Sequence, residues 1–90
     1  MKIFEAPKQE QVQVSDKQGN PVILNINMLM TTAEADEMMD KNRLVDQAVA
    51  CFGGKVEDYM EIPVAPLMKA VQYTIKALRN PDEATEIKQG

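Results

Sequence analysis

Several residue types that carry enzyme chemistry are rare or absent in this chain. It has no histidine and a single cysteine among its 90 residues. The absence of histidine removes the commonest general base, and with it the Ser-His and Cys-His nucleophile pairs. A single cysteine excludes an internal disulfide bond and a metal site built from several thiolates. We therefore expect a protein that is not an enzyme, with no catalytic residues, no cofactor and no metal ion.

Long apolar runs and an excess of positive charge are also missing. No run reaches the roughly 18 apolar residues of a membrane span, and the start of the chain lacks the apolar segment of a signal peptide. Lys and Arg number 10 against 14 Asp and Glu, so the net charge is −4. Such a balance argues against binding to the phosphates of nucleic acids. These features predict a cytoplasmic protein that binds neither membranes nor nucleic acid.

The remaining composition is typical of a small folded domain. Hydrophobic residues make up 44% of the chain and charged residues 27%, which matches ordinary globular proteins of this length. Residues 1–10 contain few large apolar side chains, and residues 81–90 are mostly polar. We expect a flexible lead-in over residues 1–10, a single domain over residues 11–80 and a flexible polar tail over residues 81–90.

Alternating apolar and polar residues predict two strands early in the chain. Every second residue is apolar in residues 11–15 and again in residues 22–28, as in strands with one buried face. Gly19 and Asn20 lie between these segments and tolerate the positive φ of a tight turn. We expect a β-hairpin whose apolar face is covered by the rest of the chain, because an isolated hairpin is not stable.

The segment Thr-Thr-Ala-Glu at residues 31–34 is a capping box and predicts the start of a helix. Apolar residues at helical spacing continue to Phe52, and the double glycine after it predicts the helix end. Asn42 interrupts the apolar stripe. Either one helix continues through Asn42, unbroken or merely kinked, or it breaks near Lys41 and Asn42 caps a second piece. The good helix formers around Asn42 favour the first alternative.

The clearest helical pattern lies between Pro63 and Asn80, where proline fits the first turn and Asn-Pro ends the helix. Residues 55–63 have no clear period and predict a loop or one short helical turn. The chain is therefore expected to be an α+β protein, with an N-terminal β-hairpin followed by two principal α-helices. The apolar stripe predicted for the second helix consists of Val64, Leu67, Met68, Val71, Ile75 and Leu78.

Three further features have simple structural explanations. Cys51 next to Phe52 is typical of a small core residue. The sequence Gly-Gly-Lys at residues 53–55 lacks the strand, loop length and Ser or Thr of a phosphate loop. The acidic residues between positions 57 and 61 do not have the spacing of a calcium-binding loop. None of these segments predicts a ligand site.

Several apolar and basic residues lie outside the apolar stripes that predict the core. Methionine adapts to different partners, and two of the seven methionines lie off the apolar stripes. An aromatic residue lies away from the stripe of the second helix, between two alanines and near three basic residues, whereas the first helix is mainly acidic. We predict that the second helix carries a protein-binding surface, for self-association or for a client, with the aromatic at its centre and basic residues at its rim. Its members are Tyr73, Ala70, Ala77, Lys69, Lys76, Arg79, Met30 and Met39.

The order of these motifs resembles a known family. Residues 12–26 read Val-x-Val-x-Asp-x-x-Gly-x-x-Val-x-Leu-x-Ile, residues 31–34 read Thr-Thr-Ala-Glu, and residues 62–71 read Ile-Pro-x-x-x-Leu-x-x-x-Val after the double glycine. This order is similar to that of the small tail assembly chaperones of long-tailed bacteriophages and prophages, over most of residues 11–80. The resemblance implies a non-covalent function in the bacterial cytoplasm. The implied partners are the tape measure protein and tail tube subunits. Separately, the opposite charges of the two helices lead us to expect that the chain associates with further copies of itself.

A different class of binding protein is the alternative, namely a small regulatory protein such as an antitoxin or a transcription-factor partner. The acidic balance and the lack of a basic helix-turn-helix speak against direct DNA binding. A neighbouring gene for a very long helical protein favours the chaperone, and a toxin-like neighbour favours the antitoxin.

Overall fold

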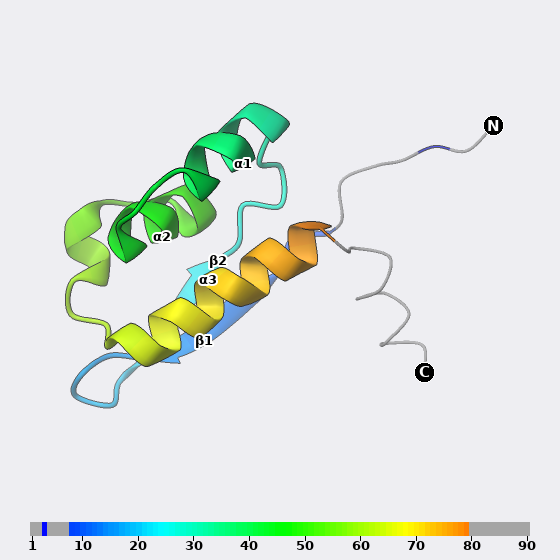
Figure 1. The fold of residues 1–90 in the computed structure, drawn as a ribbon. Helices are drawn as coiled ribbons and strands as arrows, with labels where there is room; N and C mark the ends of the chain where they lie inside the picture. The colour runs from blue at the N-terminus through cyan, green and yellow to red at the C-terminus, as the bar shows by residue number, and fades with distance from the viewer. Residues whose placement is uncertain (1–2, 4–7, 80–90) are drawn as a thin grey trace.

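The computed structural model describes residue 3 and residues 8–79. The predicted tail over residues 81–90 and most of the predicted lead-in therefore lie outside the described residues. The chain folds as a hairpin followed by helices, which confirms the predicted α+β class (Figure 1). The elements are β1 Gln11–Ser15, β2 Pro21–Asn25, α1 Thr32–Met39, α2 Leu44–Phe52, the 3-10 helix η1 Val56–Tyr59 and α3 Val64–Arg79.

The hairpin forms as the alternating pattern predicts. β1 and β2 are antiparallel, with Val12 opposite Leu24 and Val14 opposite Val22. Gly19 adopts a φ of 87° in the turn, where a side chain is disfavoured. The Asp16 carboxylate accepts the backbone N–H groups of Gln18 and Asn20, each at 2.9 Å. These bonds, with that from Asn20 as the largest contribution, hold the pKa of Asp16 below its usual value.

The first predicted helix is broken, so the expectation of a continuous or kinked helix is wrong. α1 ends at Met39, Arg43 is extended with φ −98° and ψ 134°, and α2 begins at Leu44. Asn42 is exposed and does not cap α2. Met38 and Cys51 are both buried in the core, yet a continuous helix would place them about 140° apart around its axis. The break lets both side chains face the same core.

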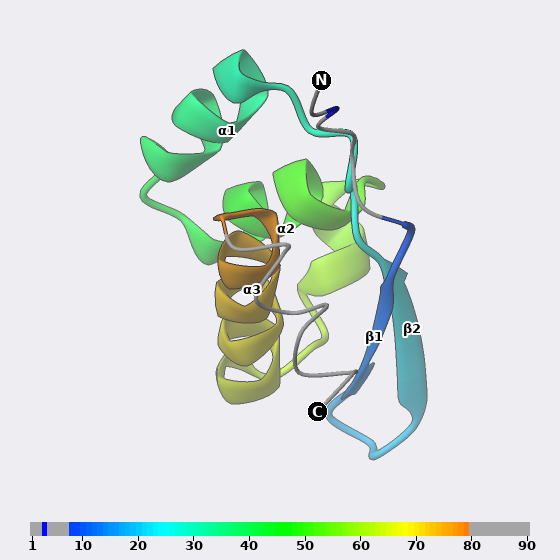
Figure 2. The same cartoon turned by 90° about the vertical axis from the view of Figure 1, so that its right-hand side faces the viewer.

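The core lies between the hairpin and the helices, which cover one face of the sheet (Figure 2). The double glycine ends α2 as predicted, and Gly53 has a φ of 79°. The chain then makes the short helical turn η1, whose Tyr59 hydroxyl donates to the Gly53 carbonyl. The buried cluster joins strands and helices through Val14, Leu24, Met38, Ala48, Cys51, Tyr59, Ile62, Leu67, Ala70 and Val71. None of the helices in the described part of the chain is both long and apolar enough to cross a membrane.

α3 is rotated relative to the predicted stripe. Val64 and Met68 are 63% and 43% exposed, although the spacing places them in the core. The buried residues are Leu67, Ala70, Val71, Thr74 and Ala77. Small side chains on this face let α3 approach β1 and α2 closely, and the Thr74 hydroxyl is satisfied by the Ala70 carbonyl at 2.9 Å. The rotation turns apolar side chains outward that the sequence pattern assigns to the core.

Candidate protein-binding surface

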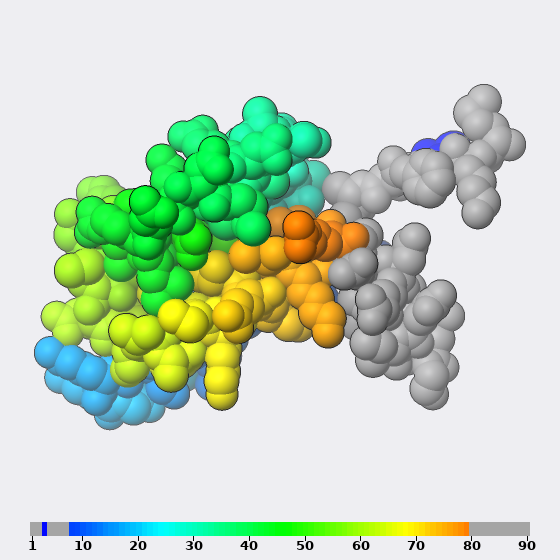
Figure 3. All heavy atoms as spheres, viewed as in Figure 1, coloured from blue at the N-terminus to red at the C-terminus, as the bar shows by residue number. Residues whose placement is uncertain are grey.

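The solvent-facing side of α3 combines positive charge with exposed apolar side chains. No acidic residue occurs between Val64 and Arg79. The helix lies along the face of the molecule shown in Figure 3, between the α1–α2 region and the hairpin turn. We call this surface the α3 outer face. Its exposed members are Val64, Met68, Lys69, Tyr73, Lys76 and Arg79.

The helical period fixes how these side chains are arranged around α3. Successive residues turn by about 100°, so Lys69 and Lys76 share the middle of the outer face. Tyr73 lies at one edge, and Val64 and Met68 lie at the other. The predicted surface has Tyr73 at its centre and cations at its rim. The structure reverses this order, because the cations are central and the apolar groups flank them.

Tyr73 connects α3 to the segment that leads into β1. Its hydroxyl donates to the Glu10 carboxylate at 3.0 Å, and the side chain remains 46% exposed. This hydrogen bond is the main reason that the pKa of Tyr73 is raised above its usual value. The Glu10 carbonyl also accepts the Ile26 N–H at 3.0 Å. The ring is therefore held at one end of the hairpin while its face stays open to solvent.

Ala70 and Ala77 are predicted to lie on the binding surface, but the structure buries both of them. Both are buried, because they belong to the face of α3 that packs inward. With Thr74 between them they form a row at i, i+4 and i+7 on that face. Both alanines are therefore part of the packed side of α3 and not of its exposed surface.

The two candidate methionines differ in position. Met30 is partly buried and packs against the core, so it is a core-filling residue and not an exposed contact. Met39 ends α1 and is 51% exposed. It is not a member of the α3 outer face, and the predicted surface is thus divided between elements.

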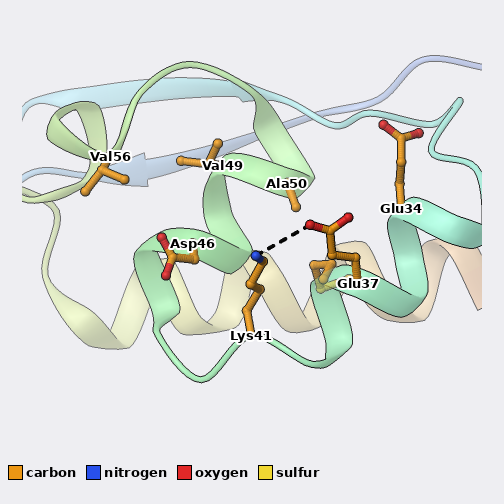
Figure 4. Close-up of a pocket in the computed structure, with 8 residues that line it drawn as sticks. Glu34, Glu37, Lys41, Asp46, Val49, Ala50 and Val56 are labelled. Atoms are coloured by element: carbon orange, nitrogen blue, oxygen red, sulfur yellow. Dashed lines mark ion pairs between the residues drawn. The ribbon is translucent and has the colours of Figure 1, made fainter.

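A concave region lies between α1, α2 and η1. Its volume is about 290 Å³, and its apolar lining comes from Met38, Val49, Ala50 and Val56. Figure 4 shows the charged side chains around it, with the Lys41 ammonium directed at the Glu37 carboxylate, 3.6 Å away. The other charged residues that line it are Glu34 and Asp46. This side of the molecule is acidic, whereas the α3 outer face is basic.

Burial or local contacts account for Cys51, Asp58 and Glu61. The Cys51 thiol is buried, and burial raises its pKa to about 11, so the reactive thiolate is scarce near neutral pH. The Asp58 carboxylate accepts the Lys55 N–H at 2.8 Å, and the Glu61 carboxylate pairs with Lys17 at 2.8 Å. Over residues 8–79 no group of three acidic, cysteine or histidine side chains is placed to hold a metal ion.

Sequence reasoning missed Val64 and Met68 as surface residues. The signal that could have found them is the row of small residues on the other side of the helix. Ala70, Thr74 and Ala77 predict a face of close helix packing, which leaves the larger residues at its flank exposed. Comparison of the chain with models of protein families, with curated proteins and with solved structures gives no match.

Proposed function

We propose that this chain is a non-enzymatic binding protein that acts as a tail assembly chaperone in the cytoplasm of a bacterial host. Its proposed partners are the tape measure protein and tail tube subunits. The observation that carries the proposal is the α3 outer face, where Lys69, Lys76 and Arg79 are flanked by exposed apolar side chains. The motif order of the sequence supports the choice of client.

The composition of the α3 outer face selects the chemistry of the client segment. A basic surface in a chain of net charge −4 attracts acidic segments, while the rest of the molecule repels them. Val64, Met68 and Tyr73 provide apolar contact area on both sides of the cations. Methionine and aromatic side chains are enriched at protein interfaces, and the flexible Met68 side chain suits a client whose sequence varies along its length. The client segment is therefore amphipathic and acidic.

Reversible binding follows from the same features. The apolar side chains are few, and exposed ion pairs contribute little to affinity. The complex therefore forms rapidly and also dissociates, as a chaperone requires when it releases its client. Added salt slows association, because exposed charges act mainly on the encounter rate.

Charge reversal on α3 tests the proposal. Titration calorimetry would measure binding to fragments of a phage tape measure protein. The double variant Lys69→Glu, Lys76→Glu should bind at least roughly tenfold more weakly than wild type, because it places repulsive charge at the centre of the surface.

The matched control changes the net charge equally but lies elsewhere. The double variant Lys41→Glu, Lys55→Glu changes one residue after α1 and one before η1, neither of them on α3. It should bind within about threefold of wild type. Equal weakening by both variants would mean that only net charge matters. If the wild-type protein bound none of the fragments, the proposed function would be refuted.

A further inference from the structure

The hairpin has a backbone edge that no other element covers. The Asp16 N–H donates to the Asn20 carbonyl at 2.9 Å, and the Ile26 N–H donates to the Glu10 carbonyl at 3.0 Å. Hydrogen-bonded pairs alternate with non-bonded pairs along an antiparallel ladder. Val12–Leu24 and Val14–Val22 are consequently the bonded pairs between these two ends. The backbone groups of Ile23 and Asn25 must then point away from β1.

These outward groups have no backbone partner among the residues that the structure describes. Figure 2 shows β1 between α3 and β2, with no element beyond β2 on that side. The uncovered stretch ends at Asn27, whose N–H donates to the Cys51 carbonyl at 2.8 Å. We call the backbone from Pro21 to Asn25 on this side the β2 edge.

No residue of β1 or β2 is charged, although 27% of the chain is charged. Proteins commonly place lysine or other charged groups on exposed strands to prevent pairing with another chain. Here the outward sheet face carries only neutral side chains, and Ile23 is 52% exposed. The residues of this neutral face are Gln11, Gln13, Ser15, Pro21, Ile23 and Asn25.

We propose that the β2 edge pairs with the β2 edge of a second copy of this chain, in antiparallel orientation about a two-fold axis at Ile23. Pairing at the β2 edge brings no like charges together, because no residue of β1 or β2 is charged. The edge is also complementary to itself, because a two-fold axis places the outward N–H groups of one copy opposite the outward carbonyls of the other.

The register of this pairing follows from the positions of the outward groups. The N–H and carbonyl of Ile23 exchange hydrogen bonds with those of Ile23 in the second copy, because both point outward. The Asn25 N–H donates to the Pro21 carbonyl across the axis. Pro21 has no N–H, so each Pro21–Asn25 pair forms only one hydrogen bond. The Ile23 pair on the axis forms two and is the main contact. The two hairpins then form one continuous antiparallel sheet, which is more stable than a two-stranded sheet.

This interface is separate from the α3 outer face, so it can be tested without a client. Analytical ultracentrifugation over a range of protein concentrations should show the mass rising from 10.1 kDa toward twice that value. Ile23→Lys should weaken the dimer by roughly tenfold or more, because it places like charges directly opposite each other across the axis.

The matched control is Gln13→Lys, which adds the same charge on the same sheet face. Gln13 is the cross-strand partner of Ile23 but lies one strand away from the β2 edge. It should change the dimer dissociation constant by less than about threefold. Ile23→Pro provides a second variant, because it removes an outward N–H and leaves the β1–β2 ladder intact. It should also weaken the dimer, with circular dichroism confirming that each variant is folded.

Other outcomes overturn the proposal. Equal weakening by Ile23→Lys and Gln13→Lys indicates that two sheet faces stack and that the edges do not pair. A stronger effect of Gln13→Lys indicates pairing through β1. A wild-type protein that remains monomeric at every concentration also refutes it, and none of these results bears on client binding by α3.

Discussion

Single side chains determine where α1 begins. The Glu34 N–H donates to the Thr31 hydroxyl at 3.2 Å, and the Thr31 N–H donates to the Glu34 carboxylate at 2.9 Å. This reciprocal pair is the predicted capping box. The bond from the Thr31 N–H is the main reason that the pKa of Glu34 is held below its usual value of 4.5. The ionised carboxylate is thus favoured more in the folded chain than in the unfolded chain.

The lowered pKa of Glu34 predicts how stability depends on pH. Its contribution is complete above 4.5, the unfolded value, and is lost as the pH falls through the lower folded value. Glu34→Gln keeps an acceptor for the Thr31 N–H but cannot titrate. Its urea midpoint should therefore fall less than that of wild type between about pH 5 and about pH 3. The control is Glu57→Gln, at an exposed position of η1. If Glu34→Gln and wild type showed the same dependence of stability on pH, the Glu34 carboxylate would not stabilise the fold through the capping box.

Residue-level signals account for the features predicted well from sequence. The turn at Gly19, the capping box at Thr31 and the helix stop at Gly53 each depend on local chemistry that a few neighbouring residues contain. The exposure of Ala70 and Ala77 was predicted wrongly, because small residues are compatible with both a surface and a close helix contact. Their position was decided by packing against elements distant in the sequence.

At the scale of elements, α3 determines both the core and the proposed binding surface. Its inward face packs on β1 and α2, and its outward face presents cations to solvent. The break between α1 and α2 is also explained by packing, because it lets Met38 and Cys51 face the same core. Local helix propensity could not predict this break, because residues 40–43 are not themselves strong helix breakers.

Matched substitutions on α3 test which face is buried. Val71 is 2% exposed and Val64 is 63% exposed. Val71→Ala should lower the free energy of unfolding by about 2 kcal/mol, because it removes buried methyl groups and leaves a cavity. Val64→Ala should change it by no more than about 0.5 kcal/mol. Chemical denaturation measures both values. An equal loss of stability in the two variants would mean that Val64 and Val71 are both buried, as the sequence pattern predicts.

At the scale of the whole molecule, charge is separated between two sides. Glu34, Glu37 and Asp46 line the concave region between α1 and α2, while the α3 outer face is basic. The sequence predicts this separation, since the acidic and basic residues lie in different helices. The arrangement within the basic face depends on the rotation of α3, which only the packed structure determines.

The proposed function requires that the α3 outer face binds the client. The decisive experiment is to titrate the isotopically labelled chain with a tape measure fragment and record the amide chemical shifts. We expect the largest changes in chemical shift at Met68, Lys69, Tyr73 and Lys76, with little change at Glu37 and Val49 in the α1–α2 concave region. Changes centred on that concave region, with unchanged α3 signals, would refute binding by the α3 outer face.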